Sequence, residues 1–170
     1  YMPKVSIVLP CYNGAKLLGE AINSCLNQTF KDWELIIIND CSTDNTLEVA
    51  NSFAEKDKRI KVFTNEKNSK LPASLNNGFR RAIGEYWTWT SDDNLLHPTM
   101  LEEMVNCLDE HDEVGFVAAD EYFIDMEGNV IGTHILPDDL DIRLPLNCYI
   151  GAAFMYRSDV ARKAGEYRED

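Results

Sequence analysis

The sequence predicts an α/β fold in which a mostly parallel sheet carries helices on both faces. Strand-like and helix-like segments alternate four times between residues 5 and 111, and such alternation is typical of βα units that build a parallel sheet. The expected strands are continuously apolar, as in Ile36, Ile37 and Ile38, which fits strands covered on both faces. No linker or low-complexity tract divides the 170 residues, so we expect a single domain.

The four units follow one another closely along the chain. Each joins a short β-prone run to a longer amphipathic segment. In order, the expected strand and helix ranges are 5–9 and 15–28, 33–39 and 43–56, 60–64 and 72–83, and 85–90 and 98–111. After about residue 113 the pattern changes to two strands around a turn at 127–129, an irregular stretch, an apolar strand at 149–156 and a short helix from Ser158.

Charge and composition exclude several classes of protein. With 29 acidic and 16 basic residues, the net charge of −13 argues against a general nucleic-acid binder and against a polybasic membrane-surface domain. No apolar run approaches the roughly 20 residues of a membrane span, and no signal segment opens the chain. The five cysteines are widely spread and lack C-x-x-C spacing. We therefore expect reduced thiols in a soluble, cytoplasmic domain, with the inner face of the membrane as an option for a longer parent protein.

Polar residues gather where each of the four expected strands ends. The endings read "PCYNG", "NDCSTD", "TNEKNSK" and "TSDDN", and ligands of open α/β sheets bind beyond the carboxyl ends of the strands. Ordinary turn chemistry explains each loop alone, whereas four such loops at one edge favour a binding site. Neither G-x-G-x-x-G nor G-x-x-x-x-G-K-[ST] occurs, which disfavours a dinucleotide dehydrogenase or a P-loop enzyme.

The fourth ending places Asp92 directly beside Asp93. Two adjacent like charges repel, so the pair is typical of a site for a positive partner such as a divalent metal ion. The alternative is a helix-capping turn, because Asp and Asn accept backbone N–H bonds and Pro98 suits a first helical turn.

Two segments of the chain read "KVSIVLPCYNGAKLLGEAINSCLNQTFKDWELIIINDCSTDNT" and "GEYWTWTSDDNLLHPTMLEEMV". Together they resemble family 2 glycosyltransferases of the GT-A (Rossmann-like) fold. The resemblance implies a nucleotide-sugar-binding half at 3–111 and the start of an acceptor-side half at 112–170. It also implies a metal-assisted, inverting hexosyltransferase of polysaccharide biosynthesis. Such an enzyme moves a sugar from a nucleotide-diphosphate donor, expected to be a UDP-sugar, to a saccharide, a lipid-linked acceptor or another hydroxyl.

The resemblance assigns donor-binding roles to four positions before the acidic pair. Pro10 and Tyr12 match positions that hold the nucleotide base, where an aromatic face can stack. Asp40 matches the residue that accepts hydrogen bonds from the base, and an ionised carboxylate suits the imide N–H of uracil. Lys70 matches a basic position that faces the nucleotide, where a cation offsets the charge of a diphosphate.

Three positions of the segment "SLNNG" depart from that pattern or serve packing. Leu75 stands where many family members have arginine, so no donor contact is expected from it. Asn76 and Gly78 fit the small polar pattern of the family's helix, and we expect both to pack against the sheet.

Asp92 and Asp93 match the acidic motif that binds the donor ribose and a divalent cation in the family. Mn²⁺ and Mg²⁺ prefer oxygen ligands and bridge carboxylates to phosphates. The usual motif has an acid two residues before Asp92, where this chain has Thr90. We therefore expect few protein ligands, with coordination completed by diphosphate and water.

The resemblance places the catalytic base beyond Asp170, since Glu169 and Asp170 match the turn before the family's acidic loop. The expectation is thus an N-terminal part of a longer enzyme, able to form a homodimer. Should the base lie within the chain, Asp120, Glu121 and residues 138–141 are the candidates. Two alternatives remain open: a nucleotide-sugar-binding module without turnover, and an unrelated α/β interaction domain whose acids only cap helices.

Overall fold

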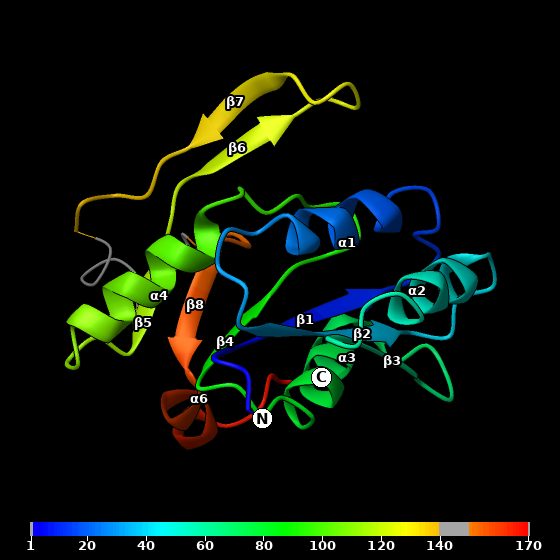
Figure 1. Cartoon of the computed structure of the whole chain (residues 1–170), viewed down its shortest axis with the longest axis horizontal. Helices are drawn as coiled ribbons and strands as arrows, with labels where there is room; N and C mark the ends of the chain where they lie inside the picture. The colour runs from blue at the N-terminus through cyan, green and yellow to red at the C-terminus, as the bar shows by residue number, and fades with distance from the viewer. Residues whose placement is uncertain (1, 140–149, 170) are drawn as a thin grey trace.

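The computed structural model describes residues 2–139 and 150–169 and confirms the α/β architecture. The described residues form a six-stranded sheet in the order β3-β2-β1-β4-β8-β5 and a separate two-stranded hairpin of β6 and β7 (Figure 1). The strands are β1 (Val5–Cys11), β2 (Trp33–Asn39), β3 (Ile60–Thr64), β4 (Tyr86–Trp89), β5 (Phe116–Ala118), β6 (Glu121–Ile124), β7 (Val130–His134) and β8 (Phe154–Arg157). The helices are α1 (Leu18–Leu26), α2 (Thr46–Ala54), α3 (Lys70–Phe79), α4 (Met100–Glu110) and α6 (Ser158–Ala164).

The register of the parallel strands aligns their carboxyl ends along one edge. In β1 and β2, Cys11 pairs with Asn39, and Asn39 pairs in turn with Thr64 of β3. Strand β4 runs parallel to β1 on the other side, and the backbone N–H of Thr90 continues that ladder by donating to Val8. We call the four loops that follow these strands, at 12–17, 40–45, 65–69 and 90–99, the rim.

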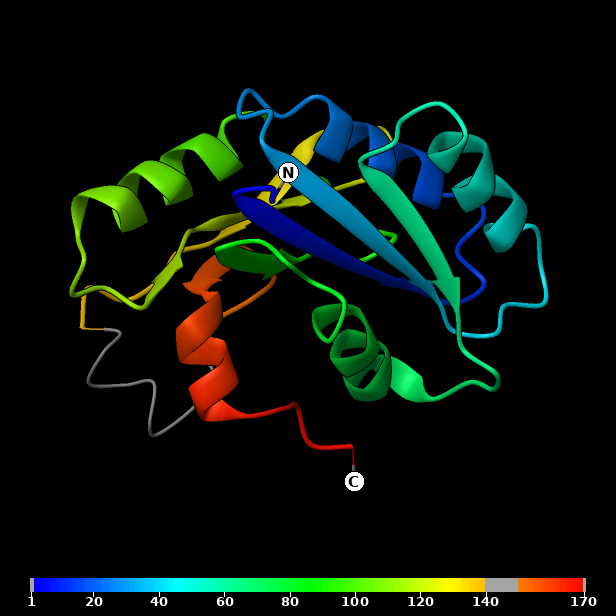
Figure 2. The same ribbon diagram turned by 60° about the horizontal axis from the view of Figure 1, so that its bottom comes forward.

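Helices cover both faces of the main sheet. Figure 2 shows α1, α2 and α4 on one side and α3 and α6 on the other. Alternate residues of β2 point to opposite sides: Leu35 and Ile37 belong to the core under α1 and α4, whereas Ile36 and Ile38 belong to the core under α3. Burying each such side chain contributes about 1.5–3 kcal/mol, so the continuously apolar strands are explained by the two helical layers.

The chain beyond α4 differs from the expectation of two strands between 114 and 135. Three strands form there, because Phe116–Ala118 separates as β5 and joins the main sheet antiparallel to β8. The following strands, β6 and β7, make the expected hairpin around the turn at 127–129. The expected apolar strand at 149–156 forms only from Phe154, as β8, and the expected short helix is α6. Residues 140–149, which include most of the expected irregular stretch, lie outside the described residues. No helix of the described residues is long and apolar enough to cross a membrane.

Candidate functional site

The loops after β1 and β2 are joined by a set of backbone-to-side-chain hydrogen bonds. The backbone N–H of Asn13 donates to the Ser42 hydroxyl at 3.0 Å, and the side-chain oxygen of Asn13 accepts from the backbone N–H of Thr43 at 2.8 Å. One residue further, the Gly14 N–H donates to the Thr46 hydroxyl at 2.9 Å. These bonds cross from one strand end to the next, so the first two loops of the rim form one rigid unit.

Three non-glycine residues with positive φ lie in, or directly after, the loops that follow β1, β2 and β3. They are Asn13 at 53°, Cys41 at 61° and Lys70 at 70°. Such backbone conformations are uncommon outside glycine and concentrate at functional sites. Within the described residues, the conformations of this kind at non-glycine positions are confined to this edge of the sheet.

The half-buried carboxyl group of Asp92 lies against the backbone of Gly14. A Cβ atom added at Gly14 would stand 1.8 Å from Asp92 Oδ2, so only glycine allows this approach. Burial, and secondarily the charge of Asp93, raise the pKa of Asp92. Asp93 itself is exposed and accepts a hydrogen bond from the Ser91 hydroxyl. The pair thus presents one partly desolvated and one solvated carboxylate, an arrangement that a bound cation would stabilise.

Three carboxylates from two loops, 40–45 and 90–99, act on the Cys11 thiol. Burial first, and then the nearby charges of Asp92, Asp44 and Asp40 in that order, raise the pKa of Cys11 to about 12. No Lys or Arg among the described residues forms an ion pair with any of these three acids or with Asp93. The centre of the rim is therefore strongly negative.

Asp40 is buried and braces the start of α3. Its side chain is 4% exposed and accepts three hydrogen bonds, from Asn65 Nδ2 at 2.8 Å, from the Ser69 N–H at 2.8 Å and from the Lys70 N–H at 2.9 Å. An ionised carboxylate has about four acceptor positions, so one remains for a ligand. No local pattern of residues predicts that Asp40 stabilises the start of α3, because the donors of these hydrogen bonds lie 25 to 30 residues away in the sequence.

The other expected donor-binding residues differ in how exposed they are to solvent. Tyr12 is 49% exposed at the rim, where its ring can contact a ligand. Pro10 is a buried residue of β1, paired with Ile38 of β2. Lys70 is exposed beside Asp40, whereas Leu75 is buried in the core under α3, as its apolar side chain requires.

The acidic pair does not cap the helix that follows it. Helix α4 begins at Met100, seven residues after Asp93, with Thr99 at its N-cap position. The backbone N–H of Asn94 instead makes a local bond to the Ser91 carbonyl. In the part of the chain that the structure describes, no three His, Cys, Asp or Glu residues form a cluster able to hold a metal ion by themselves. A cation here would therefore depend on ligand oxygens as well.

Gly78 packs against the sheet as expected, and the buried Asn76 also makes contacts beyond it. A Cβ atom at Gly78 would lie 2.3 Å from Val8 Cγ1, so the glycine brings α3 close to β1. Asn76 binds the segment after α6 through hydrogen bonds to Tyr167 and Glu169. Glu169 is consequently held against α3 rather than frayed.

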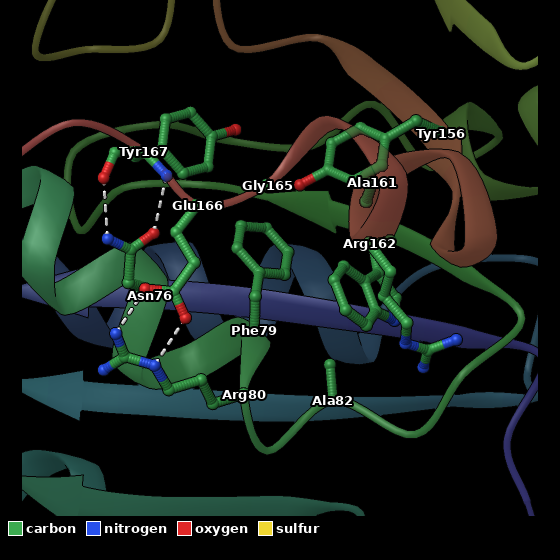
Figure 3. Close-up of a pocket in the computed structure, with 11 residues that line it drawn as sticks. Asn76, Phe79, Arg80, Ala82, Tyr156, Ala161, Arg162, Gly165, Glu166 and Tyr167 are labelled. Atoms are coloured by element: carbon green, nitrogen blue, oxygen red, sulfur yellow. Dashed lines mark hydrogen bonds and ion pairs between the residues drawn. The ribbon is translucent and has the colours of Figure 1, made fainter.

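A cavity lies apart from the rim, between α3 and α6 (Figure 3). It has a volume of about 310 Å³ and is lined by the rings of Phe79, Trp87, Tyr156 and Tyr167. The first two rings stack with centroids 5.2 Å apart. No rim residue lines it, so this cavity and the residues that could carry chemistry lie in different parts of the structure. We base the candidate site on the rim, because the carboxylates and the positive-φ residues gather there.

Two of the base candidates are already engaged by backbone groups. Asp120 accepts from the Leu136 N–H at 2.8 Å, and Glu121 accepts from the Ala153 N–H at 2.9 Å. Residues 138 and 139 are described, whereas residues 140 and 141 lie outside the described residues.

Comparison with known sequences gives a family match over nearly the whole chain. A family model described as Glycosyl transferase family 2 matches residues 6–165. An uncharacterised glycosyltransferase of Haemophilus influenzae is 38% identical over 130 residues, covering 76% of this chain and 52% of that protein. EpsE of Bacillus subtilis, named as a candidate glycosyltransferase, is 40% identical over 136 residues, covering 79% and 49%. The chain thus spans about half the length of these two relatives.

Solved structures share the fold at low sequence identity. The 1–349 segment of S. aureus TarS in complex with UDP superimposes with a TM-score of 0.79 at 23% identity, covering 98% of this chain and 50% of that one. The mannosyltransferase PcManGT from Pyrobaculum calidifontis, in complex with GDP-Man and Mn²⁺, gives a TM-score of 0.76 at 19% identity, covering 100% and 49%. These likenesses establish the fold of the chain.

Proposed function

Because the chain belongs to glycosyl transferase family 2 and has its GT-A fold, we propose that the rim binds a nucleotide-diphosphate sugar through a divalent cation. The observation that carries the proposal is the pair Asp92 and Asp93. One carboxylate is partly buried against Gly14 with a raised pKa, the other is exposed, and no described Lys or Arg pairs with either. This negative centre suits a ligand that brings its own positive charge.

The residues present fit Mn²⁺ or Mg²⁺ bound together with a diphosphate. Asp92 and Asp93 offer the oxygen ligands that these ions prefer, and the lack of a third nearby acidic or imidazole ligand in the described residues leaves room for phosphate oxygens. PcManGT has been solved with Mn²⁺ and GDP-Man bound, which supports the same kind of complex here. When bound, the cation stabilises negative charge on the departing diphosphate as a Lewis acid.

We assign the donor base to the part of the rim formed by Tyr12 and Asp40. The exposed ring of Tyr12 can stack on a base, and Asp40 retains about one acceptor position for an N–H group. Uracil offers such an imide N–H, and TarS has been solved with UDP and with UDP-GlcNAc. We therefore favour a UDP-sugar donor, with Lys70 near the diphosphate and Pro10 supporting the loop from within β1.

The whole protein is proposed to transfer the sugar to a hydroxyl of a saccharide or lipid-linked acceptor with inversion. In this division, 3–111 holds the donor and 112–170 begins the acceptor side. A carboxylate base beyond Asp170 would take the proton of the attacking hydroxyl. Donor binding by this chain without transfer by the full-length protein would favour the alternative of a binding module without turnover.

A thermal-shift screen tests the donor site directly. UDP, GDP and ADP are each added with and without Mn²⁺, because a ligand that binds only the folded state raises its apparent stability. We expect the largest rise in melting temperature with UDP and Mn²⁺ together. A larger rise with GDP would still support the donor site, but would identify guanine instead of uracil as the base that it binds. No rise with any nucleotide would contradict the proposal.

A further inference from the structure

A serine of helix α1 holds the loop that follows β4. The Ser24 hydroxyl accepts from the Leu96 N–H at 3.1 Å and donates to the Ala21 carbonyl of its own helix at 2.7 Å. Leu96 is 8% exposed and belongs to the core under α1. Since Leu96 lies three residues after Asp93, the loop is fixed to α1 soon after the acidic pair.

The side-chain amide of Gln28, just after the end of α1, makes a second attachment. Its Nε2 donates to the His97 carbonyl at 2.8 Å, and its Oε1 accepts from the Leu101 N–H at 3.1 Å. Gln28 is fully buried, and buried polar groups that lose their partners are costly. Helix α4, which begins here, lies on the same face of the sheet as α1 (Figure 2). Gln28 therefore keeps the end of the loop at a fixed place beside α1.

The acidic pair is also fixed on its other side. The Thr90 N–H donates to the Val8 carbonyl at 3.0 Å, and the carboxyl group of Asp92 lies against the backbone of Gly14. The Gly14 carbonyl in turn accepts from the Leu18 N–H at 3.0 Å, at the start of α1. Helix α1 is thus attached to the loop near both of its own ends, and the acidic pair lies between the two attachments.

From these contacts we propose that Ser24 and Gln28 are positioning residues for the acidic pair, holding Asp92 and Asp93 where a divalent cation and a diphosphate can bind them together. The inference rests on the function proposed for the rim. Adjacent carboxylates repel, so the pair needs support to keep one arrangement before a cation binds. Gln28 and Leu96 are buried within the described residues, so their contacts do not depend on what covers the surface of this chain.

A purely structural role for the same bonds is the competing explanation. In that case Ser24 and Gln28 only join α1 to α4, and losing their bonds lowers the stability of the chain. The folded chain would then bind nucleotide with its normal affinity. A positioning role instead predicts that affinity falls in a folded variant, and that the loss depends on Asp93.

Ser24→Ala and Ser52→Ala form a matched pair of variants. Each serine is the seventh residue of a nine-residue helix and donates to the carbonyl three residues before it at 2.7 Å. Ser24 differs in that it also accepts the Leu96 N–H. In calorimetric titration with Mn²⁺ present, UDP affinity should fall about 2- to 10-fold in Ser24→Ala, the effect of one hydrogen bond. It should stay unchanged in Ser52→Ala.

Gln28→Met tests the second attachment. Methionine has a similar length but leaves the His97 carbonyl and the Leu101 N–H without this partner. We expect UDP affinity in the presence of Mn²⁺ to fall about 10- to 100-fold, as when groups that orient metal ligands are removed. The control is Ser6→Ala, which removes two buried hydrogen bonds at the end of β1 opposite the rim. It should lower stability in urea denaturation and leave UDP affinity unchanged.

Combined variants test whether Ser24 acts through the acidic pair. Independent sites multiply their losses of affinity, whereas residues that share one interaction do not. Ser24→Ala should therefore change UDP binding little further when it is added to Asp93→Asn. Added to Tyr12→Ala, at the base-binding part of the rim, it should weaken binding by its full factor.

The outcomes separate this inference from the function on which it rests. Absence of Mn²⁺-dependent UDP binding by the unmodified chain would contradict the proposed function, and the inference with it. If the unmodified chain binds, normal affinity in Ser24→Ala or in folded Gln28→Met would overturn the positioning role alone. So would equal losses in Ser24→Ala and Ser52→Ala, or a full further loss when Ser24→Ala is added to Asp93→Asn. Should Gln28→Met not fold, the two serine variants still decide.

Discussion

The side-chain amide of Asn76 binds the backbone of Tyr167 at two points. Asn76 Nδ2 donates to the Tyr167 carbonyl at 2.9 Å, and Asn76 Oδ1 accepts from the Tyr167 N–H at 2.8 Å. The same Nδ2 also donates to Glu169 Oε1 at 2.8 Å. One residue of α3, 91 positions earlier in the chain, thereby fixes the segment that follows α6. Arg80 adds an ion pair to Glu166 on the same segment (Figure 3).

Replacing Asn76 by alanine should release this segment. Asn76 is 3% exposed, and loss of its bonds should lower the free energy of unfolding by about 1–2 kcal/mol. The Tyr167 amide should also exchange its hydrogen faster with solvent. Urea denaturation and hydrogen exchange measure the two effects. Asn51→Ala, at an exposed position of α2, is the control; it should not lower the free energy of unfolding and should leave hydrogen exchange at Tyr167 unchanged. Unchanged exchange at Tyr167 in Asn76→Ala would contradict the proposal that Asn76 holds this segment in place.

The elements of the donor half could be predicted well because their signals are local. The ranges 33–39 and 60–64 coincide with β2 and β3, since each is a continuous β-prone run bounded by polar residues. The predicted helix at 72–83 instead begins at Lys70. Asp40 holds the Ser69 and Lys70 N–H groups there, and this contact across about 30 residues leaves no local signal. Strand β5 was missed because three residues are too few to show a period.

A methyl group at Gly14 should disturb Asp92 without unfolding the chain. In Gly14→Ala the new atom would stand 1.8 Å from Asp92 Oδ2, so the carboxylate must move. We expect a stability loss of about 1–3 kcal/mol from overpacking and cation-dependent UDP binding weakened by about 10- to 100-fold. Calorimetry measures the binding.

Gly19→Ala provides the matched control. The added Cβ would lie 3.9 Å from Phe53, an ordinary contact within α1, and should stabilise the helix by about 0.5–1 kcal/mol. Its UDP binding should stay unchanged. Equal binding losses in the two variants would mean that Gly14 has no particular relation to the site.

The raised pKa of Asp92 predicts a pH-dependent stability difference. Burial first, and Asp93 second, raise the pKa of Asp92, so the folded chain holds a proton there more tightly than the unfolded chain. The stability linked to this group is complete below the unfolded pKa of about 4 and is lost as pH rises through the folded pKa. Asp92→Asn avoids that loss and should be more stable than the unmodified chain at pH 7. Its advantage should shrink as pH falls toward 4 in urea denaturation; an advantage independent of pH would rule out this explanation.

Tyr12→Ala should weaken nucleotide binding while preserving stability. The ring is 49% exposed, so its removal costs little packing, whereas a base–aromatic stack is worth about 1–3 kcal/mol, or roughly 5- to 150-fold in affinity. Tyr122→Ala, at an exposed position of the hairpin, is the control and should bind normally. Normal binding by Tyr12→Ala as well would place the base elsewhere.

The residues of the candidate site could be predicted from the sequence, but the contacts that hold them in place could not. The polar strand endings predicted the position of the rim. Asp92 and Asp93 were singled out because two adjacent like charges repel and suggest a positive partner. The close approach of Gly14 to Asp92 depends on how two loops 78 residues apart meet, and two of the three bonds to Asp40 depend on the third loop. Substitution of Asp40 by alanine should therefore damage the start of α3 as well as any ligand contact, and Asp40→Asn is the better probe of its role.

The function proposed for the rim depends on Asp92 and Asp93 binding a nucleotide diphosphate together with a divalent cation. Calorimetric titration decides this: UDP is titrated into the unmodified chain with Mn²⁺, and again with excess chelator, beside Asp93→Asn and the surface control Glu48→Gln. We expect binding with Mn²⁺, loss of binding with chelator, strongly weakened binding in Asp93→Asn and normal binding in the control. Equal UDP affinity with and without chelator, or unchanged affinity in Asp93→Asn, would contradict the proposed role of the acidic pair.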